Sequence, residues 1–264
     1  MSTIDYEFKR QVLAGEPKIG SFMNTGSPIA VELGAQAGLD WMTLDLEHGM
    51  GSWERVLQQL IAVTGHSTFP VIRLPLLRQE YFKKAFDMGA MGVMVPYVET
   101  AEQAAEAVQF TRYPPRGIRG VAVSNRGSEF GGRFKEWLER SHEATLVITQ
   151  IESRKALDNL DGIAATEGVD VLFIGPLDLS VSLGIPQQFD HPDFIAAKAA
   201  VVAAAKKHGK AAGILGFTPD QVADRLAEGF TCLSFGSDGG NLASGFRNLV
   251  EASRAAFAAG KHQS

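Results

Sequence analysis

The chain has little cysteine and no long apolar run. Its 264 residues include one cysteine, Cys232, which excludes an intramolecular disulfide and a zinc site built on cysteine ligands. Cys232 lies in the apolar stretch TCLSFG, so we expect a buried structural thiol rather than a nucleophile. No window approaches the roughly eighteen apolar residues of a membrane span, and MSTIDYEFKR lacks the apolar core of a secretion signal. These features predict a cytoplasmic protein that does not enter a membrane.

Basic residues are few and scattered. The chain has 25 lysines and arginines against 30 aspartates and glutamates, a net charge of −5, and no basic run longer than pairs such as Lys83-Lys84. We therefore expect no nucleic-acid partner and no anionic membrane surface. With 45% hydrophobic residues the chain can bury a substantial core. No linker or shift in composition divides it, so residues 1–264 are predicted to form a single domain, with its core from about 17 to 258.

Apolar runs of strand length recur along the chain, each bounded by Gly, Pro or a polar cluster. Strands are predicted over residues 18–24, 41–46, 69–75, 92–98, 145–152, 169–175, 210–216 and 231–236. Helical patterns follow at 52–65, 78–89, 100–112, 153–168, 191–209 and 218–229. Continuous apolar runs are typical of parallel strands covered on both faces. The pattern predicts an α/β fold, the (β/α)₈ TIM barrel; a doubly wound open sheet is the alternative, but no GxGxxG follows the first strand.

The longest departure from this pattern lies between the fourth and fifth strands, at residues 113–143. The segment is too long for a plain connection, so we predict an extended loop and helix insertion that serves as a lid, a binding loop or an oligomer contact. A further helix is expected at the C-terminus. Gly239-Gly240 at its start could offer backbone amides to an anion, or could simply form a flexible turn.

Polar residues gather where the predicted strands end. They are Asp45, Glu47 and His48 after the second strand, Arg73 in the third, Gln150 and Glu152 after the fifth, and Asp178 after the sixth. In a barrel the carboxyl ends of the strands meet on one rim, where the chemistry of such folds takes place. We therefore expect these groups to converge on one site, whereas any single stretch alone could be a solvated loop.

Several of these residues leave two interpretations open. The carboxylates of Glu152 and Asp178 suit a hard divalent cation, or they form a solvated pair at the barrel mouth. Arg73, a cation in an apolar strand, needs an anionic partner, which is either a substrate carboxylate or a structural one from Glu47 or Asp45.

His48 is the candidate general base. It can exchange protons near neutral pH if Asp45 holds its other ring nitrogen, although a histidine in a loop is more often solvent-facing.

Six stretches, taken together in order and spacing, resemble one known family. They are DLEHG (45–49), PVIRLP (70–75), GAMGVMVPYVETAEQA (89–104), TRYPPRGIRG (111–120), QIES (150–153) and GPLDLSVSLG (175–184). The chain resembles the HpcH/HpaI family of metal-dependent 2-oxo acid aldolases, which has citrate-lyase-like relatives, over about residues 17 to 258.

The resemblance implies a (β/α)₈ barrel in which Glu152 and Asp178 hold a divalent cation, Mg²⁺, Mn²⁺ or Co²⁺. A 2-oxo acid such as pyruvate would bind there, with Arg73 at the carbonyl oxygen that becomes the enolate oxygen. Backbone amides around Leu177 and Asp178 would receive the substrate carboxylate. The leucine at 177 departs from the small residue usual in this family, and could narrow the pocket or change its donor preference.

The resemblance further implies that His48, oriented by Asp45, removes and returns the proton. Gln150 and Leu215 would lie beside the bound oxo acid. Family members usually assemble as homo-oligomers, so a trimer or hexamer is expected.

The implied activity is reversible cleavage of a 4-hydroxy-2-oxo acid into pyruvate or hydroxypyruvate plus an aldehyde. It needs positive charge where the enolate oxygen develops, which the cation and Arg73 would supply. No lysine ends a predicted strand, which disfavours a Schiff-base mechanism. A lyase acting on a CoA thioester is the alternative, with basic contacts from Arg112, Arg116, Arg119 and Arg126. A third possibility is a barrel that only binds a sugar acid.

Overall fold

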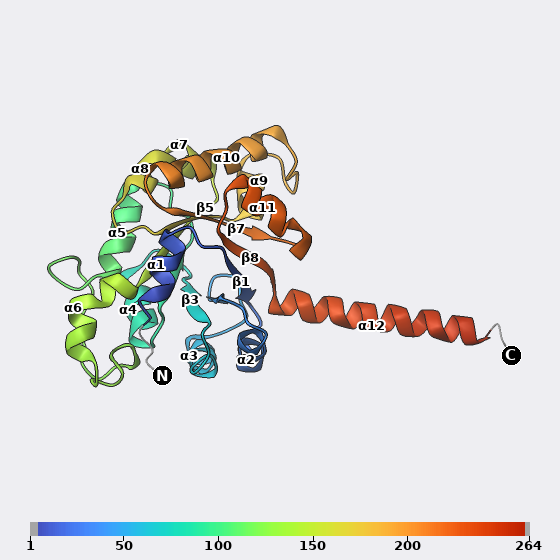
Figure 1. The fold of residues 1–264 in the computed structure, drawn as a ribbon, viewed down its shortest axis with the longest axis horizontal. Coiled ribbons are helices and arrows are strands. Elements are labelled where there is room, and N and C mark those ends of the chain that lie inside the picture. The colour runs from blue at the N-terminus through green and yellow to red at the C-terminus, as the bar shows by residue number, and fades with distance from the viewer. Residues whose placement is uncertain (1–4, 262–264) are drawn as a thin grey trace.

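Eight parallel strands close into a barrel in the computed structural model, which describes residues 5–261. They are β1 (Lys18–Met23), β2 (Trp41–Asp45), β3 (Phe69–Arg73), β4 (Gly92–Val95), β5 (Leu146–Ile151), β6 (Val171–Ile174), β7 (Ala211–Gly216) and β8 (Cys232–Ser237). Each strand pairs with the next along the chain, and β8 pairs with β1 to complete the ring. The predicted (β/α)₈ barrel is confirmed, with every strand where the apolar runs placed it (Figure 1).

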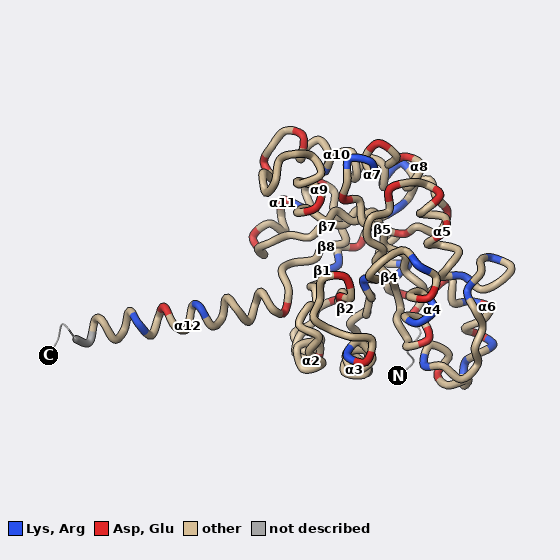
Figure 2. Tube along the Cα trace, turned by 180° about the vertical axis from the view of Figure 1, so that it is seen from behind, with Lys and Arg blue, Asp and Glu red and all other residues tan. Residues whose placement is uncertain are grey.

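Helices surround the barrel. They are α1 (Glu7–Leu13), α2 (Pro28–Gln36), α3 (Trp53–Ala62), α4 (Gln79–Asp87), α5 (Ala101–Thr111), α7 (Arg154–Asp158), α8 (Leu160–Ala165), α9 (Pro176–Ser182), α10 (Pro192–Lys207) and α11 (Val222–Glu228), with a 3₁₀ turn, η2 (Pro219–Gln221), before α11. The side chains of Ser52, Thr100 and Ser153 cap α3, α5 and α7 by accepting a backbone N–H three residues ahead. Acidic and basic residues are interspersed over these helices (Figure 2). No helix within residues 5–261 is long and apolar enough to cross a membrane.

The core has two layers because both faces of the strands are covered. Trp41, Phe69 and Phe173 fill the barrel interior, and a larger aliphatic layer lies between the strands and the helices. A Cβ at Gly20 of β1 would lie 2.5 Å from the Trp41 indole, so glycine there leaves room for that ring. Burial on both faces explains why the strands appear in the sequence as continuous apolar runs.

The insertion between β4 and β5 follows α5 and contains the 3₁₀ turn η1 (Arg126–Ser128) and the helix α6 (Phe134–Ala144). It is attached to the outer wall through three arginines, of which Arg112 and Arg119 are buried and Arg126 is half-buried. Arg119 pairs with Asp87 at 3.2 Å and lies over the Tyr113 ring at 4.5 Å. Arg112 donates to the His142 carbonyl at 2.8 Å, and Arg126 donates to carbonyls at the ends of α3 and α4. These three cations are therefore engaged within the chain.

The last helix, α12 (Asp238–Lys261), extends away from the barrel rather than lying against it (Figure 1). Its 24 residues would span about 36 Å at 1.5 Å per residue. The Asp238 carboxylate fixes its start by accepting backbone N–H groups of Asn24 at 2.8 Å and Thr25 at 3.2 Å. These bonds tie the first turn of α12 to the end of β1.

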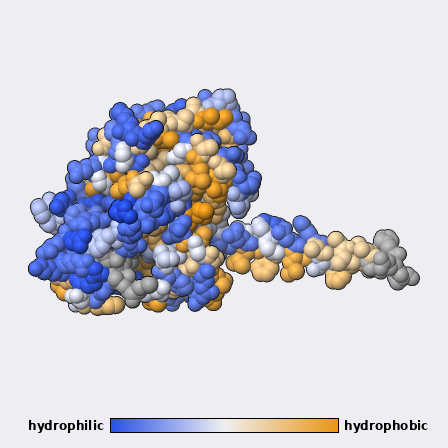
Figure 3. All heavy atoms as spheres, in the orientation of Figure 1, coloured by the Kyte–Doolittle hydropathy of each residue, from blue (hydrophilic) through white to orange (hydrophobic). Residues whose placement is uncertain are grey.

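One side of α12 is apolar and exposed. This α12 apolar face consists of Leu242, Phe246, Leu249, Val250 and Phe257, of which Phe246 is 65% and Phe257 71% exposed. The spacing places all five side chains on one side of the helix, visible as an orange band in Figure 3. In most barrels of this type the eighth helix buries such a face against the strands. Here it has no covering within residues 5–261.

Candidate active site

Asp45 and Arg73 are the last residues of β2 and β3, and the strand register places them directly opposite one another. Arg73 Nε donates to Asp45 Oδ1 at 2.9 Å, and Arg73 Nη2 donates to Oδ2 at 2.7 Å. Both side chains are buried. The pair is therefore a bidentate fork in which neither partner can turn without breaking a charge-assisted hydrogen bond.

A second carboxylate completes the surroundings of this cation. Arg73 Nη1 lies 3.0 Å from Glu47 Oε2, and the guanidinium carbon lies 4.8 Å from the centre of the Phe22 ring. Burial raises the pKa of Glu47, and the charge on Arg73 opposes that rise. The sequence leaves Asp45 and Glu47 as alternative structural partners of Arg73, and in the structure Arg73 pairs with both.

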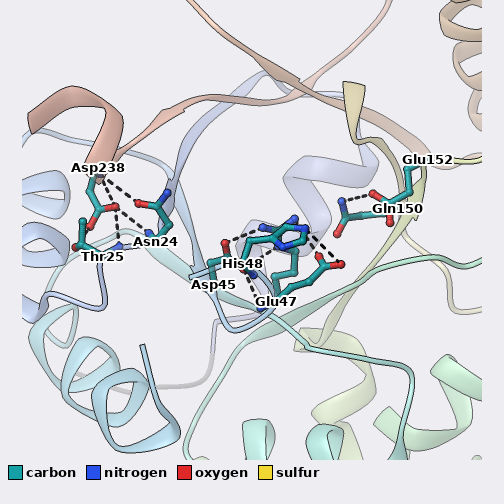
Figure 4. A network of polar contacts seen from close by, with 10 residues as sticks. Asn24, Thr25, Asp45, Glu47, His48, Gln150, Glu152 and Asp238 are labelled. Carbon is teal, nitrogen blue, oxygen red and sulfur yellow. Dashed lines mark hydrogen bonds and ion pairs between the residues drawn. The ribbon is translucent and has the colours of Figure 1, made fainter. Parts of the chain in front are cut away.

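The predicted contact between Asp45 and the His48 imidazole is wrong in this geometry. Asp45 Oδ1 instead accepts the backbone N–H groups of Glu47 at 3.0 Å and His48 at 3.2 Å, while both oxygens also receive Arg73. The His48 ring faces Glu47, with Nε2 3.8 Å from Oε1, and is 64% exposed (Figure 4). Asp45 thus positions Arg73 and the backbone of the turn, because the β2–β3 register places the arginine nearest to it.

Gln150 and Glu152 point to the same side of the barrel, as their spacing predicts. Gln150 Nε2 donates to Glu152 Oε2 at 2.8 Å, and the backbone N–H of Tyr97 donates to Oε1 at 2.8 Å. Burial raises the pKa of Glu152 to about 8, and the nearby Glu47 and Asp178 carboxylates add to that rise. The hydrogen bond from Tyr97 and the charge on Arg73 oppose it.

Asp178 lies in the first turn of α9 and is half-buried. The Tyr97 hydroxyl donates to Asp178 Oδ1 at 3.2 Å. Tyr97, in the loop after β4, therefore contacts both carboxylates that were predicted to hold a cation. The sequence analysis does not include Tyr97 among the site residues. The signal was its place in VPYVET, at the end of the fourth predicted strand, since the ends of other strands supply the predicted site residues.

The donor set fits a divalent cation. Within residues 5–261, no three His, Cys, Asp or Glu side chains form a group able to hold a metal ion by themselves. Glu152 and Asp178 offer two carboxylates, and the buried Gln150 Oε1 has no hydrogen-bond partner. A carboxylate whose pKa is raised to about 8 by burial is one that lacks a countercharge. Hard cations such as Mg²⁺ use few protein carboxylates and complete their coordination with water and substrate oxygens.

These groups meet at a cavity of about 310 Å³ in the mouth of the barrel. Asp45, His48, Arg73, Gln150 and Asp178 line it. Glu152 is not among the lining residues; it is 2% exposed and accepts a hydrogen bond from Gln150, which is one of them.

Apolar side chains form another part of the wall, together with Asn24, Ser237 and several glycines. Leu177, Leu215 and Phe217 are among them, so the predicted Leu177 and Leu215 do lie at the site. A cavity lined by both polar and apolar side chains suits a small organic acid whose charged end must be oriented.

A buried arginine fork, two carboxylates and an exposed imidazole at the carboxyl ends of barrel strands define an enzyme site for a small anionic molecule. Residues 18–245 match the model of the HpcH/HpaI aldolase/citrate lyase family. The chain is 41% identical to 5-keto-4-deoxy-D-glucarate aldolase of Klebsiella pneumoniae over 246 residues, 93% of this chain and 96% of that protein.

Solved structures agree with this match. An HpcH/HpaI aldolase/citrate lyase family protein from Burkholderia cenocepacia superposes with a TM-score of 0.90 at 35% identity, covering 95% of this chain and all (100%) of that one. The HpcH/HpaI aldolase from Desulfitobacterium hafniense gives 0.86 at 28% identity, covering 93% and 96%. The chain belongs to the HpcH/HpaI aldolase/citrate lyase family and is an enzyme of the lyase class, as its motifs predict.

Proposed function

We propose that the protein is a cytoplasmic class II aldolase that depends on a divalent metal. It reversibly cleaves 4-hydroxy-2-oxo acids to pyruvate or hydroxypyruvate plus an aldehyde. The observation that carries this proposal is the buried Arg73, which is held by two carboxylates and faces the same cavity as Gln150 and Asp178. A cation fixed in this way costs no reorganisation when negative charge develops on a substrate oxygen.

Each residue then has a separate task. Glu152 and Asp178 would hold Mg²⁺, Mn²⁺ or Co²⁺, which when bound supplies Lewis acidity toward the 2-oxo group. Arg73 would stabilise the oxygen that gains charge as the bond breaks, and Asp45 keeps it in place. Backbone amides around Leu177 would receive the substrate carboxylate, with Gln150 beside it.

His48 would remove the methyl proton of pyruvate and return it during cleavage. Its ring lines the cavity and is exposed enough to exchange protons with solvent. An imidazole suits a reaction that must run in both directions, because it can give back the proton it takes. Its neighbouring carboxylate is Glu47 rather than Asp45.

The names of the relatives indicate the first substrate to test, 5-keto-4-deoxy-D-glucarate. Leu177, Leu215 and Phe217 form the apolar part of the wall against which the two product halves would rest. The choice between pyruvate and hydroxypyruvate as the preferred donor would depend on how much room these side chains leave.

The CoA-thioester alternative lacks a comparable observation. It needs several basic groups free to hold a nucleotide. Of the four arginines predicted for that role, Arg112, Arg119 and Arg126 are engaged inside the chain, and Arg116 is exposed. A protein that only binds a sugar acid would not need an exposed imidazole beside the buried cation.

A coupled assay tests the proposal. Pyruvate released from 5-keto-4-deoxy-D-glucarate is followed with lactate dehydrogenase, in chelated enzyme and after Mg²⁺, Mn²⁺ or Co²⁺ is added. We expect activity only with metal, and its loss in Glu152→Ala and Asp178→Ala. Activity that survives thorough chelation would contradict the metal-dependent mechanism, and turnover that requires a CoA ester would favour the alternative.

We also propose that the enzyme works as a homo-oligomer, a trimer or a hexamer, in which the α12 apolar face packs on a second copy. Five exposed apolar side chains on a helix that leaves its own barrel support this assembly. The doubly substituted Phe246→Asp, Leu249→Asp variant should shift the mass measured by light scattering to a smaller species. Asn248→Asp, on the opposite side of the helix, is the control. A monomeric wild-type chain would contradict the proposal.

A further inference from the structure

Tyr97 has an unusual backbone conformation for a bulky residue. It follows β4 and Pro96, and its φ is +50°, in the left-handed region. That region is disfavoured for side chains with a Cβ, so such a residue remains there only where its surroundings hold it. Strained residues of this kind concentrate at functional sites.

Contacts between two neighbouring loops hold Tyr97 in this conformation. Its backbone N–H donates to Glu152 Oε1 at 2.8 Å. Two residues further on, Glu99 accepts the Ser153 hydroxyl at 2.8 Å and pairs with Lys155 at 3.0 Å. The loop after β4 is thus tied to Glu152 itself and to the start of α7, just beyond it.

This conformation allows one residue to reach both metal-site carboxylates. The backbone of Tyr97 binds Glu152, and its hydroxyl donates to Asp178 Oδ1 at 3.2 Å. A carboxylate oxygen can only accept a hydrogen bond, so the Tyr97 hydroxyl is the donor in its contact with Asp178.

The two carboxylates differ in how firmly they are held. Glu152 is 2% exposed and accepts hydrogen bonds at both oxygens, from Gln150 and from the Tyr97 backbone. Asp178 is half-buried in a seven-residue helix. Among the described residues, Tyr97 is the hydrogen-bond partner of its carboxylate. An aspartate with rotational freedom must lose it when a cation binds, which weakens binding.

We propose that Tyr97 is a positioning residue whose hydroxyl holds Asp178 in the orientation that a divalent cation requires. With Oδ1 bound to the Tyr97 hydroxyl, Oδ2 would remain to hold the cation together with Glu152. Its role is to set metal affinity rather than to take part in the chemistry. The inference rests on the proposed metal-dependent function, since it assigns Glu152 and Asp178 as ligands.

The test measures Mn²⁺ binding to the full chain without substrate, by electron paramagnetic resonance of free Mn²⁺. Tyr97→Phe keeps the ring and removes only the hydroxyl. We expect its Kd to rise about tenfold, as is typical when an outer partner of a metal ligand is lost. At saturating Mn²⁺ its kcat should stay within about twofold of wild type, because the cation then fixes Asp178 directly.

Tyr81→Phe is the matched control, because Tyr81 lies on α4 and stacks on Trp53 at 6.0 Å. A Tyr97→Phe Kd equal to that of wild type and Tyr81→Phe would overturn the inference. An unchanged Kd with a large fall in kcat would do so as well, and would place Tyr97 in the chemistry. If wild type and Glu152→Ala bound Mn²⁺ equally weakly, the metal site itself would be refuted, and the inference with it.

Discussion

Replacing Arg73 with lysine should lower kcat/KM by about 10²–10³-fold and leave Mn²⁺ affinity nearly unchanged. Lysine keeps the charge but loses the planar fork. One ammonium group cannot reproduce the contacts of Nε and Nη2 with Asp45, at 2.9 and 2.7 Å, together with that of Nη1 with Glu47 at 3.0 Å. The enolate oxygen would then lack a hydrogen-bond donor that is held in position before the charge develops.

The size of the effect follows from the hydrogen bonds that lysine cannot make. A hydrogen bond to a charged group is worth about 1.5–3 kcal/mol, and removing one fixed donor at a developing oxyanion costs about 2.7–4 kcal/mol. Lysine is a better probe than alanine for a structural reason. Alanine would leave Asp45, which is 3% exposed, and Glu47 without their cation, at a cost of about 3–5 kcal/mol in folding stability.

Three measurements on Arg73→Lys separate an effect on catalysis from effects on metal binding and on stability. They are kcat/KM in the coupled pyruvate assay, Kd for Mn²⁺, and the thermal midpoint. Arg55→Lys is the control, since Arg55 is exposed on α3, where its side chain donates to the nearby Gln58. A value of kcat/KM within about threefold of wild type would refute the enolate-stabilising role of Arg73. A parallel loss of Mn²⁺ binding would show that Arg73 supports the metal site instead.

His48→Ala should lower deuterium exchange of the pyruvate methyl group at least about 10²-fold while Mn²⁺ binding persists; full exchange would remove His48 from the role of base. Burial raises the pKa of Glu152 from 4.5 to about 8, so the folded chelated protein binds more protons than the unfolded one over that range. Its thermal midpoint in EDTA should therefore fall as pH rises from about 5 to 8, and Glu152→Gln should make this fall with pH smaller. An equal fall in wild type and Glu152→Gln would contradict the raised pKa of Glu152. Burial raises the pKa of Cys232 to about 12, so the native thiol should not react with Ellman's reagent at pH 8 but should react fully in denaturant. Rapid reaction of the native protein would contradict the buried placement.

The barrel and the place of the site follow from simple physical regularities. Strands buried on both faces must be apolar throughout, so the eight runs stand out in the sequence. Closing them into a ring brings their carboxyl ends together, which is why Asp45, Arg73 and Gln150 could be assigned to one site before any contact was known.

The choice among nearby partners could not be predicted in the same way. Asp45 has both Arg73 and His48 within reach, and the preference depends on the register of β2 against β3, which pairs Asp45 with Arg73. The left-handed conformation of Tyr97 depends on contacts with residues more than fifty positions away, such as Glu152. No local pattern near residue 97 encodes it.

The direction in which α12 extends could not be predicted from the sequence either. Its apolar face predicts an amphipathic helix that must be covered. The pattern is the same whether the covering surface is its own barrel or a second molecule, so only the structure shows that the helix leaves the barrel.

Metal-dependent enolate formation is the step that the proposed chemistry requires, and exchange of the pyruvate methyl protons reports it. Pyruvate in D₂O is incubated with the enzyme, first chelated and then with Mn²⁺ or Mg²⁺, and the methyl signal is followed by proton NMR. We expect the signal to decay with metal and to stay constant without it, whatever aldehyde the enzyme uses. Exchange that proceeds equally in chelated enzyme, or no exchange of pyruvate or hydroxypyruvate with any of the three metals, would contradict metal-dependent enolate formation.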